Sequence, residues 1–245
     1  MRKRIIVICA VVLALLIAMG YYLSLMMDES RNAAVSQMRM ANTTEQESGT
    51  ASSKTAATVA VPDLVSLLGM SLDDAVDKLG YSTSEVTMPL SMTDGGPAKT
   101  VKAVILVRER AEAKVGTPTV YLGLDDDDKV VHVGFSAGTS SLGYASLSFS
   151  DLIMNEHIVQ ATLKKAGLDI PDNAVVLPED KASYSEYDSD GTTRKTEMVD
   201  FEGTAEKGDT QYAWSAAVYY DYTQANASGN LVNTLRQIFI SVRAA

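Results

Sequence analysis

The sequence predicts an α+β fold in which an N-terminal transmembrane helix precedes two tandem units, each a helix with an antiparallel sheet. Three observations predict it. An apolar stretch follows a basic N-terminal end, from Ile5 to Met27. Helix signals and then several strand-like runs lie between residues 61 and 145, and the same order recurs between residues 146 and 245. Consecutive strands leave no room for the helical crossovers of a parallel sheet, so the sheets should be antiparallel.

The apolar stretch predicts the location of the protein. Residues 5–27 would span about 35 Å as a helix, enough for a bilayer core of about 30 Å. Arg2, Lys3 and Arg4 precede it, so residues 1–27 are expected to form a cytoplasmic end and single-pass anchor in a bacterial cell envelope, with an extracytoplasmic C-terminal domain. A cleaved signal peptide ending at Ala18-Met19-Gly20 is the alternative. Both interpretations place the domain outside the cytoplasm.

Composition excludes several classes of function. Residues 28–60 are rich in Ser, Thr, Ala and Gln and are expected to form a flexible linker. The one cysteine, Cys9, lies in the apolar stretch, so the domain has no thiol for a disulfide, a nucleophile or a zinc site. A net charge of −10 argues against binding nucleic acid.

The first unit, residues 61–145, begins with helix signals. Ser71 has the spacing of an N-cap with an acidic residue three positions later, apolar residues follow at helical spacing from Leu72 to Leu79, and Gly80 can end the helix. A short helix from Pro62 to Leu68 could precede it. Three strand-like runs follow, which are Val101–Arg108, Thr119–Leu124 and Lys129–Phe135.

The second unit, residues 146–245, repeats the order. A helix is expected from Asp151 to Ala166, with Ser150 at its start and Gly167 at its end. Strands are expected at Thr196–Thr204, Gln211–Thr223 and Leu231–Arg243. The similarity between the halves lies in the order of elements rather than in the residues.

The segment from Gly69-Met70-Ser71-Leu72 to Leu79-Gly80 resembles two exported families. One is the β-lactamase-inhibitor-like fold, shared with small outer-membrane assembly lipoproteins, whose units pair two helices with antiparallel strands. The other is the PASTA module of cell-wall sensors, whose opening Val-Pro-Asp-Leu matches Val61-Pro62-Asp63-Leu64, although the spacing to Gly69 is longer here. The resemblance covers about twenty residues, and it implies a protein without enzymatic activity.

One segment matches a catalytic motif. Gly134-Phe135-Ser136-Ala137-Gly138 fits the G-x-S-x-G nucleophile elbow of serine hydrolases. The elbow needs a helix after the serine and a histidine further downstream. Thr139 to Gly143 does not begin a helix, and the only downstream histidine, His157, comes just 21 residues after Ser136. A serine hydrolase using Ser136 is therefore the alternative function.

The candidate metal ligands fit a structural role better. Asp125 to Asp128 and the Asp188/Asp190 turn lack the alternation and distal glutamate of a calcium loop. His132 lies on the polar face of a predicted strand, and His157 on a predicted helix next to Glu156. We expect no metal site and no cofactor.

An aromatic row is the candidate binding surface. Tyr212, Trp214, Tyr220 and Tyr222 share one face of the strand from Gln211 to Thr223. Such a row can be buried core, but tyrosine and tryptophan also suit a contact surface. Trp214 is expected to be buried, and Tyr220 or Tyr222 to be partly exposed.

Together these observations predict a membrane-anchored extracytoplasmic binding protein without catalytic activity. Its partner would be a protein or a cell-wall component such as peptidoglycan. A divergent PASTA-like cell-wall sensor is a further alternative.

Overall fold

The computed structural model describes residues 59–85, 100–107, 116–144 and 147–245. Ile5 to Met27 and most of the predicted linker lie outside these residues. Among the helices that are described, none is long and apolar enough to span a membrane. The longest, α2 (Leu72–Leu79) and α4 (Ile158–Lys165), have 8 residues each, or about 12 Å against a bilayer core of about 30 Å. The predicted transmembrane helix and single-pass signal-anchor are therefore corrected and not retained.

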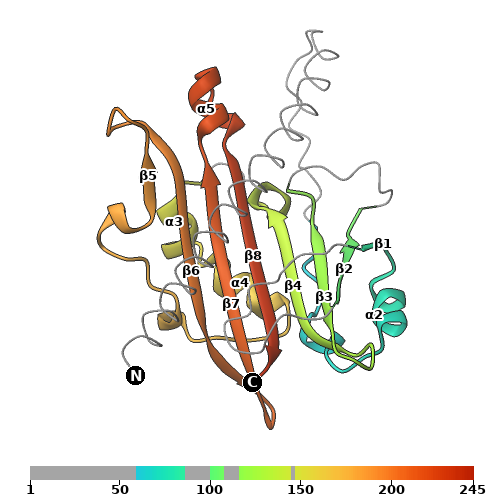
Figure 1. Ribbon diagram of the computed structural model, residues 1–245. Coiled ribbons are helices and arrows are strands. Elements are labelled where there is room, and N and C mark those ends of the chain that lie inside the picture. Colours follow the sequence, from blue (N-terminus) through green and yellow to red (C-terminus); the bar gives the residue numbers. More distant parts are fainter. Residues whose placement is uncertain (1–58, 86–99, 108–115, 145–146) are drawn as a thin grey trace, which may run out of the picture. The chain divides into compact units, whose positions relative to one another are not determined.

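The described residues form one compact unit around an eight-stranded antiparallel sheet with the order β1-β2-β3-β4-β8-β7-β6-β5 (Figure 1). The strands are β1 (Ser82–Glu85), β2 (Thr100–Ile105), β3 (Thr119–Leu124), β4 (Val130–Gly138), β5 (Ser185–Tyr187), β6 (Arg194–Lys207), β7 (Thr210–Asp221) and β8 (Leu235–Ala244).

This topology corrects the prediction of two tandem units with separate sheets. Strands β1 to β4 form one four-stranded meander and β5 to β8 form a second. The last strand of each meander pairs with the other, from His132↔Arg243 to Gly138↔Gln237. A free edge would leave backbone N–H and C=O groups unpaired, and this pairing satisfies them. The predicted domain boundary, at residues 145 and 146, lies outside the described residues.

The helix predicted after Ser71 is confirmed. The Ser71 hydroxyl accepts a hydrogen bond from the Asp74 backbone N–H at 3.2 Å, which satisfies one of the free N–H groups at the start of α2. Gly80 ends the helix with a φ of 69°, a conformation that glycine adopts without steric cost. A short 3-10 helix, η1 (Val65–Leu67), precedes α2.

The helix predicted from Asp151 to Ala166 is two helices. α3 (Phe149–Met154) has Ser148 rather than Ser150 as its N-cap, and α4 begins after His157. His157 has a φ of 49°, in the left-handed region that a right-handed helix cannot include. The remaining elements are the short helices η3 (Thr139–Leu142), η4 (Asp172–Ala174), η5 (Lys181–Ser183), α5 (Thr223–Ser228) and η6 (Leu231–Asn233).

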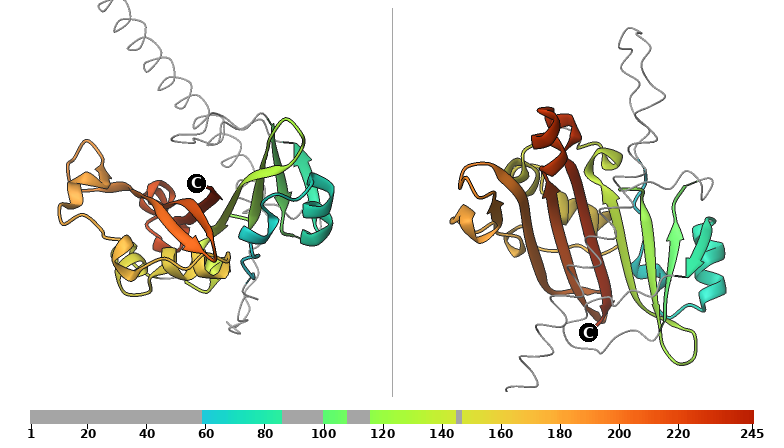
Figure 2. Two further views of the ribbon diagram at one scale, coloured as in Figure 1. Left: turned by 90° about the horizontal axis from the view of Figure 1, so that it is seen from below. Right: turned by 45° about the horizontal axis from the view of Figure 1, so that its top comes forward.

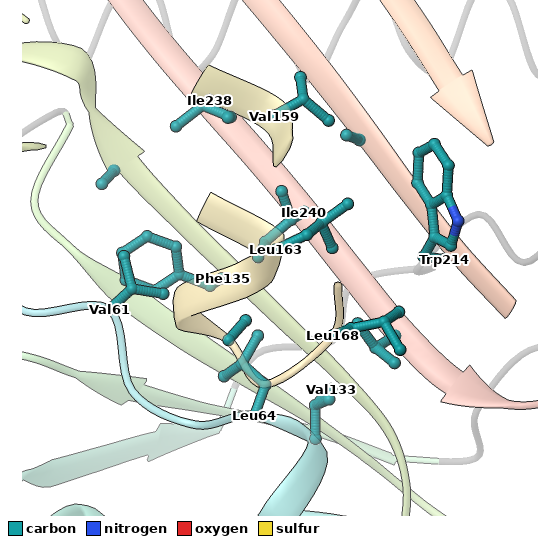
Figure 3. Packing of buried hydrophobic residues seen from close by; sticks show 14 of the residues in the cluster. Val61, Leu64, Val133, Phe135, Val159, Leu163, Leu168, Trp214, Ile238 and Ile240 are labelled. Atoms are coloured by element: carbon teal, nitrogen blue, oxygen red, sulfur yellow. The ribbon is translucent and has the colours of Figure 1, made fainter. Parts of the chain in front are cut away.

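The core lies between the sheet and helices α3 and α4. Val159 and Leu163 of α4 lie against Phe135 of β4 and Ile238 and Ile240 of β8, and all five are fully buried (Figure 3). The helix layer therefore packs across the junction between the two meanders. The segment before α2 is attached to it, because the Val65 backbone N–H donates to the Ala166 carbonyl at 3.1 Å.

The opposite side of the sheet is called the helix-free face, because helices α3 and α4 lie on the other side. Figure 2 (left) shows that the sheet bends and that this face is the concave one. Side chains alternate between the faces of a strand, and the cross-strand register assigns each residue. The central part of the helix-free face consists of Gly134 and Ser136 of β4, Gln237, Phe239 and Ser241 of β8, and Ala213, Ser215, Ala217 and Tyr219 of β7.

We expect the junction between the meanders to be essential for stability. Replacing Ile240 with alanine removes buried methyl groups beneath α4 and should cost about 2–5 kcal/mol of unfolding free energy. Val131 of β4 is 40 % exposed, so Val131→Ala should change stability by less than about 1 kcal/mol. Urea denaturation measures both, and equal losses would contradict the packing described.

Candidate functional site: the helix-free face

The predicted aromatic row faces the helices. Trp214 and Tyr220 are buried, at 3 % and 1 % exposure, while Tyr212 and Tyr222 are half-buried and pack against the core. The Trp214 ring lies over Gly203, where an added Cβ would stand 2.9 Å from it. Glycine at this position lets the indole lie flat on the neighbouring strand. The structure therefore places Trp214 and Tyr220 in the core rather than on a contact surface.

Tyr220 is fixed by the helix layer. Its ring packs edge-on against Phe149, with centroids 5.3 Å apart, and its hydroxyl donates to the Leu147 carbonyl at 3.1 Å. Burial raises the pKa of Tyr220 to about 12, so the hydroxyl keeps its proton and acts as a donor.

Tyr222 belongs to a partly buried charge network around Glu197. Its hydroxyl donates to the Glu197 carboxylate. Arg194 pairs with the other carboxylate oxygen at 3.0 Å, and its guanidinium lies 5.8 Å from the centre of the Tyr222 ring. The Glu197 side chain is only 4 % exposed, so it needs both partners to offset its desolvation. Burial, followed by Glu197, raises the pKa of Tyr222 well above its usual range, so this tyrosine is a donor and not a proton acceptor.

The row should thus behave as structure. Trp214→Ala should cost about 3–5 kcal/mol of stability through the cavity it leaves. Tyr222→Phe should cost about 1–3 kcal/mol, because it removes one donor from a buried carboxylate. Tyr81 is 46 % exposed, and Tyr81→Phe serves as the control. Thermal and urea melts measure the stability of the three variants. A Trp214→Ala protein as stable as the control would contradict the placement of Trp214 in the core.

The Ser136 motif lacks the geometry of a nucleophile elbow. Ser136 lies inside β4, paired with Thr119 of β3 and Phe239 of β8, whereas the elbow requires a sharp turn between a strand and a helix. Its hydroxyl lies 3.3 Å from the Tyr121 hydroxyl. No backbone turn exposes Ser136 for attack on a substrate.

Neither histidine is placed to activate Ser136. His157 is exposed between α3 and α4, in the helix layer, while Ser136 points to the helix-free face. His132 is on the same face of β4 but four residues away, about 13 Å along a strand. Burial, followed by the charge of Arg243, lowers the pKa of His132 to about 4, so it is neutral at pH 7.

The acidic turns use their carboxylates locally. Asp125 Oδ1 accepts the backbone N–H groups of Asp127 and Lys129, both at 2.9 Å. Asp190 Oδ1 accepts those of Thr192 and Thr193 at 2.8 and 2.7 Å. In residues 59–245, as far as they are described, no three His, Cys, Asp or Glu side chains come together as a metal site would require.

A serine probe can test the interpretation of Ser136 directly. We expect native full-length protein to form no adduct at Ser136 with a fluorophosphonate, because a serine hydroxyl that no general base activates reacts poorly. Mass spectrometry of the wild type and of Ser136→Ala should give the same result. An adduct on Ser136 that disappears when the protein is unfolded would restore the hydrolase alternative.

The central part of the helix-free face, which we call the floor, has an unusual composition. On β4, β7 and β8 its central residues are mostly small, namely Gly134, Ser136, Ala213, Ser215, Ala217 and Ser241. Solvated faces of antiparallel sheets usually carry polar and charged side chains in such positions. The charged residues that the register places on this face of these three strands, Arg243 and Asp221, lie toward opposite ends.

Two aromatic residues stand on this floor. Phe239 and Tyr121 are half-buried with ring centroids 6.0 Å apart. Phe239 also covers Gly134, where an added Cβ would lie 3.1 Å from its ring. Beside them, the Ser215 and Ser241 hydroxyls are 2.8 Å apart. The floor thus combines small side chains with an aromatic pair.

An acidic strand borders the floor. On β6, Met198, Asp200 and Glu202 are exposed on the same face, opposite Tyr219, Ala217 and Ser215 of β7. The face is therefore neutral along its centre and negative along one side. The sequence correctly separates the two faces of β7, but its small residues on the side opposite the aromatic row gave no signal of a binding surface on their own.

No protein-family model, curated protein or solved structure matches the chain. The resemblances of the segment from Gly69 to Gly80 therefore stay predictions.

Proposed function

We propose that this protein is a non-catalytic binding protein whose helix-free face holds a cationic helix of a partner protein. The observation that carries the proposal is the floor of small side chains with Phe239 and Tyr121 at its centre. The location of the protein outside the cytoplasm stays a prediction from the N-terminal sequence. Binding of a cell-wall component is the competing outcome.

The shape of the face favours a convex partner. Two concave faces of this kind would touch only at their rims, which argues against a second copy lying face to face. An α-helix is a rod about 10 Å across and suits a trough. Ser215 and Ala217 would let its backbone approach the sheet closely, and Phe239, whose ring covers Gly134, would provide the aromatic anchor typical of interface centres.

The charge of the face favours a basic partner. Asp200 and Glu202 flank the floor on β6 and are exposed. Opposite charges across an interface accelerate association and select the partner. Lysines or arginines on one side of the bound helix would meet this border, while its apolar side would contact the floor.

Selection from a library of random phage-displayed peptides against the full-length protein tests the proposal. Enriched peptides should carry a net positive charge and become helical on binding. The synthetic form of an enriched peptide should lose binding to Ala217→Arg, which fills the floor. With Asp200→Asn and Glu202→Gln combined, its affinity should fall about tenfold, or roughly 1.4 kcal/mol.

Met154→Arg is the matched control, because Met154 is 42 % exposed on α3 in the helix layer. It should bind the peptide as the wild type does. Peptides that bind Ala217→Arg as well as the wild type would contradict the proposal. The proposal would also be contradicted if the selection enriched no peptides while soluble peptidoglycan fragments bound the face in a separate assay.

A further inference from the structure

Strand β6 has a long outer edge that β5 covers only at one end. β6 has 14 residues, but β5 pairs with it only from Arg194 to Glu197 (Figure 1). Beyond that point, the Met198 backbone N–H donates to the Tyr184 carbonyl at 2.8 Å. Within the described part of the chain, no backbone group pairs with the outer side of β6 from Val199 to Lys207.

The unpaired backbone groups belong to alternate residues of β6. In an antiparallel pair, residues that exchange hydrogen bonds with one neighbour alternate with residues whose N–H and C=O groups point to the other side. The Tyr222 N–H donates to the Lys195 carbonyl at 2.8 Å, so the odd-numbered residues of β6 bond to β7. The register continues without a break to Lys207↔Thr210. The residues whose backbone groups point outward are therefore Asp200, Glu202, Thr204 and Glu206.

This edge lacks the usual features that prevent strand addition. Edge strands are commonly kept very short or interrupted by a proline or a β-bulge. Residues 198–207 contain no proline, and their register with β7 shows no bulge. By contrast β1, at the other edge of the sheet, has only 4 residues. The open stretch from Asp200 to Glu206 is about 20 Å long, which is enough to pair with a further strand.

The charge of the edge opposes pairing with a second copy of the chain. The side chains of Asp200, Glu202, Thr204 and Glu206 share the helix-free face, and all four are exposed. Symmetric antiparallel pairing centred on Gly203 would place Asp200 opposite Glu206 of the second copy. Neighbouring registers also bring carboxylates together. Like charges directly opposite each other destabilise a strand pair, so the edge selects against itself.

The same charge favours a basic strand of another protein. Lysine or arginine at alternate positions would lie opposite the carboxylates on the helix-free face, where opposite charges stabilise a strand pair. On the side of the helices, β6 presents Phe201, which is buried, and Val199 and Ala205, which are partly buried against the core. Apolar residues at the intervening positions of the added strand would extend this surface.

We propose that an extended segment of a partner protein, with basic and apolar residues in alternation, adds to the sheet at β6 as an antiparallel ninth strand. The antiparallel direction gives the more stable pairing per residue. This contact uses the edge of the sheet rather than the floor, so it goes beyond the proposed function. Thr204 and Glu206 belong to the edge and not to the acidic border of the floor.

Two N-methylated forms of the peptide acetyl-Lys-Val-Lys-Val-Lys-Val-Lys-amide test the proposal by isothermal titration calorimetry with the full-length protein. When the lysines lie opposite the carboxylates, their backbone N–H groups point to β6 and those of the valines point away. Methylating the valine nitrogens should leave the affinity of the unmodified peptide unchanged. Methylating as many lysine backbone nitrogens should weaken binding at least about tenfold, because hydrogen bonds to the edge are lost. The two forms have the same charge, so equal affinities would overturn the proposal.

Variants of the edge provide the second test. Thr204→Pro removes one outward N–H group and should weaken binding of the unmodified peptide at least about tenfold. Its matched control, Thr204→Ala, keeps the backbone group and should bind like the wild type. Glu206→Gln should weaken binding about two- to fivefold, as expected for an exposed ion pair. Circular dichroism melts establish that the variants are folded.

A folded Thr204→Pro protein that binds the peptide like the wild type would overturn the proposal. Analytical ultracentrifugation tests the other occupant, a second copy. We expect the wild type to keep a constant mass as its concentration rises. A wild type that dimerises, together with a Thr204→Pro protein that does not, would assign the edge to a second copy and overturn the proposal as well.

Discussion

The antiparallel pairing of β4 with β8 is the interaction on which the rest of the structure depends. It joins two four-stranded meanders through the register His132↔Arg243 to Gly138↔Gln237. It also brings Phe135 of the first meander beside Ile240 of the second, so that α4 covers a continuous apolar surface. Without it, each meander would present a free edge and half of a core. Backbone hydrogen bonds and apolar burial therefore act at the same place, which makes the two halves interdependent.

The same pairing creates the helix-free face. Residues of β4 and β8 that do not face the helices, such as Gly134 and Ser241, lie opposite each other at its centre. A floor built from both meanders exists only while they are joined. The proposed binding function thus depends on the pairing of the two meanders at their junction.

Much of the local structure could be predicted from the sequence, and the assembly of the elements could not. Ser71 and Gly80 mark the ends of α2 because capping is a local interaction. The run from Thr119 to Leu124 is a strand with the predicted bounds. The break at His157 was missed because apolar residues continue at helical spacing on both sides. β1 and β5 were missed because short edge strands rich in Ser, Thr and Glu carry little apolar pattern. The joining of the sheets was missed because periodicity within a strand carries no information about its neighbour.

For the candidate site, the prediction that the aromatic residues of β7 share one face was correct. The helices cover that face, however, and the small residues on the opposite face had given no signal of a binding surface on their own.

Native-state hydrogen exchange tests the β4–β8 junction most directly. If the two meanders form one sheet, the paired amides of β4 and β8 should be among the slowest to exchange. They should also share one opening free energy, equal to that of global unfolding. Exchange of either strand at the fast rate of an edge strand, or two halves that open with different free energies, would contradict the account.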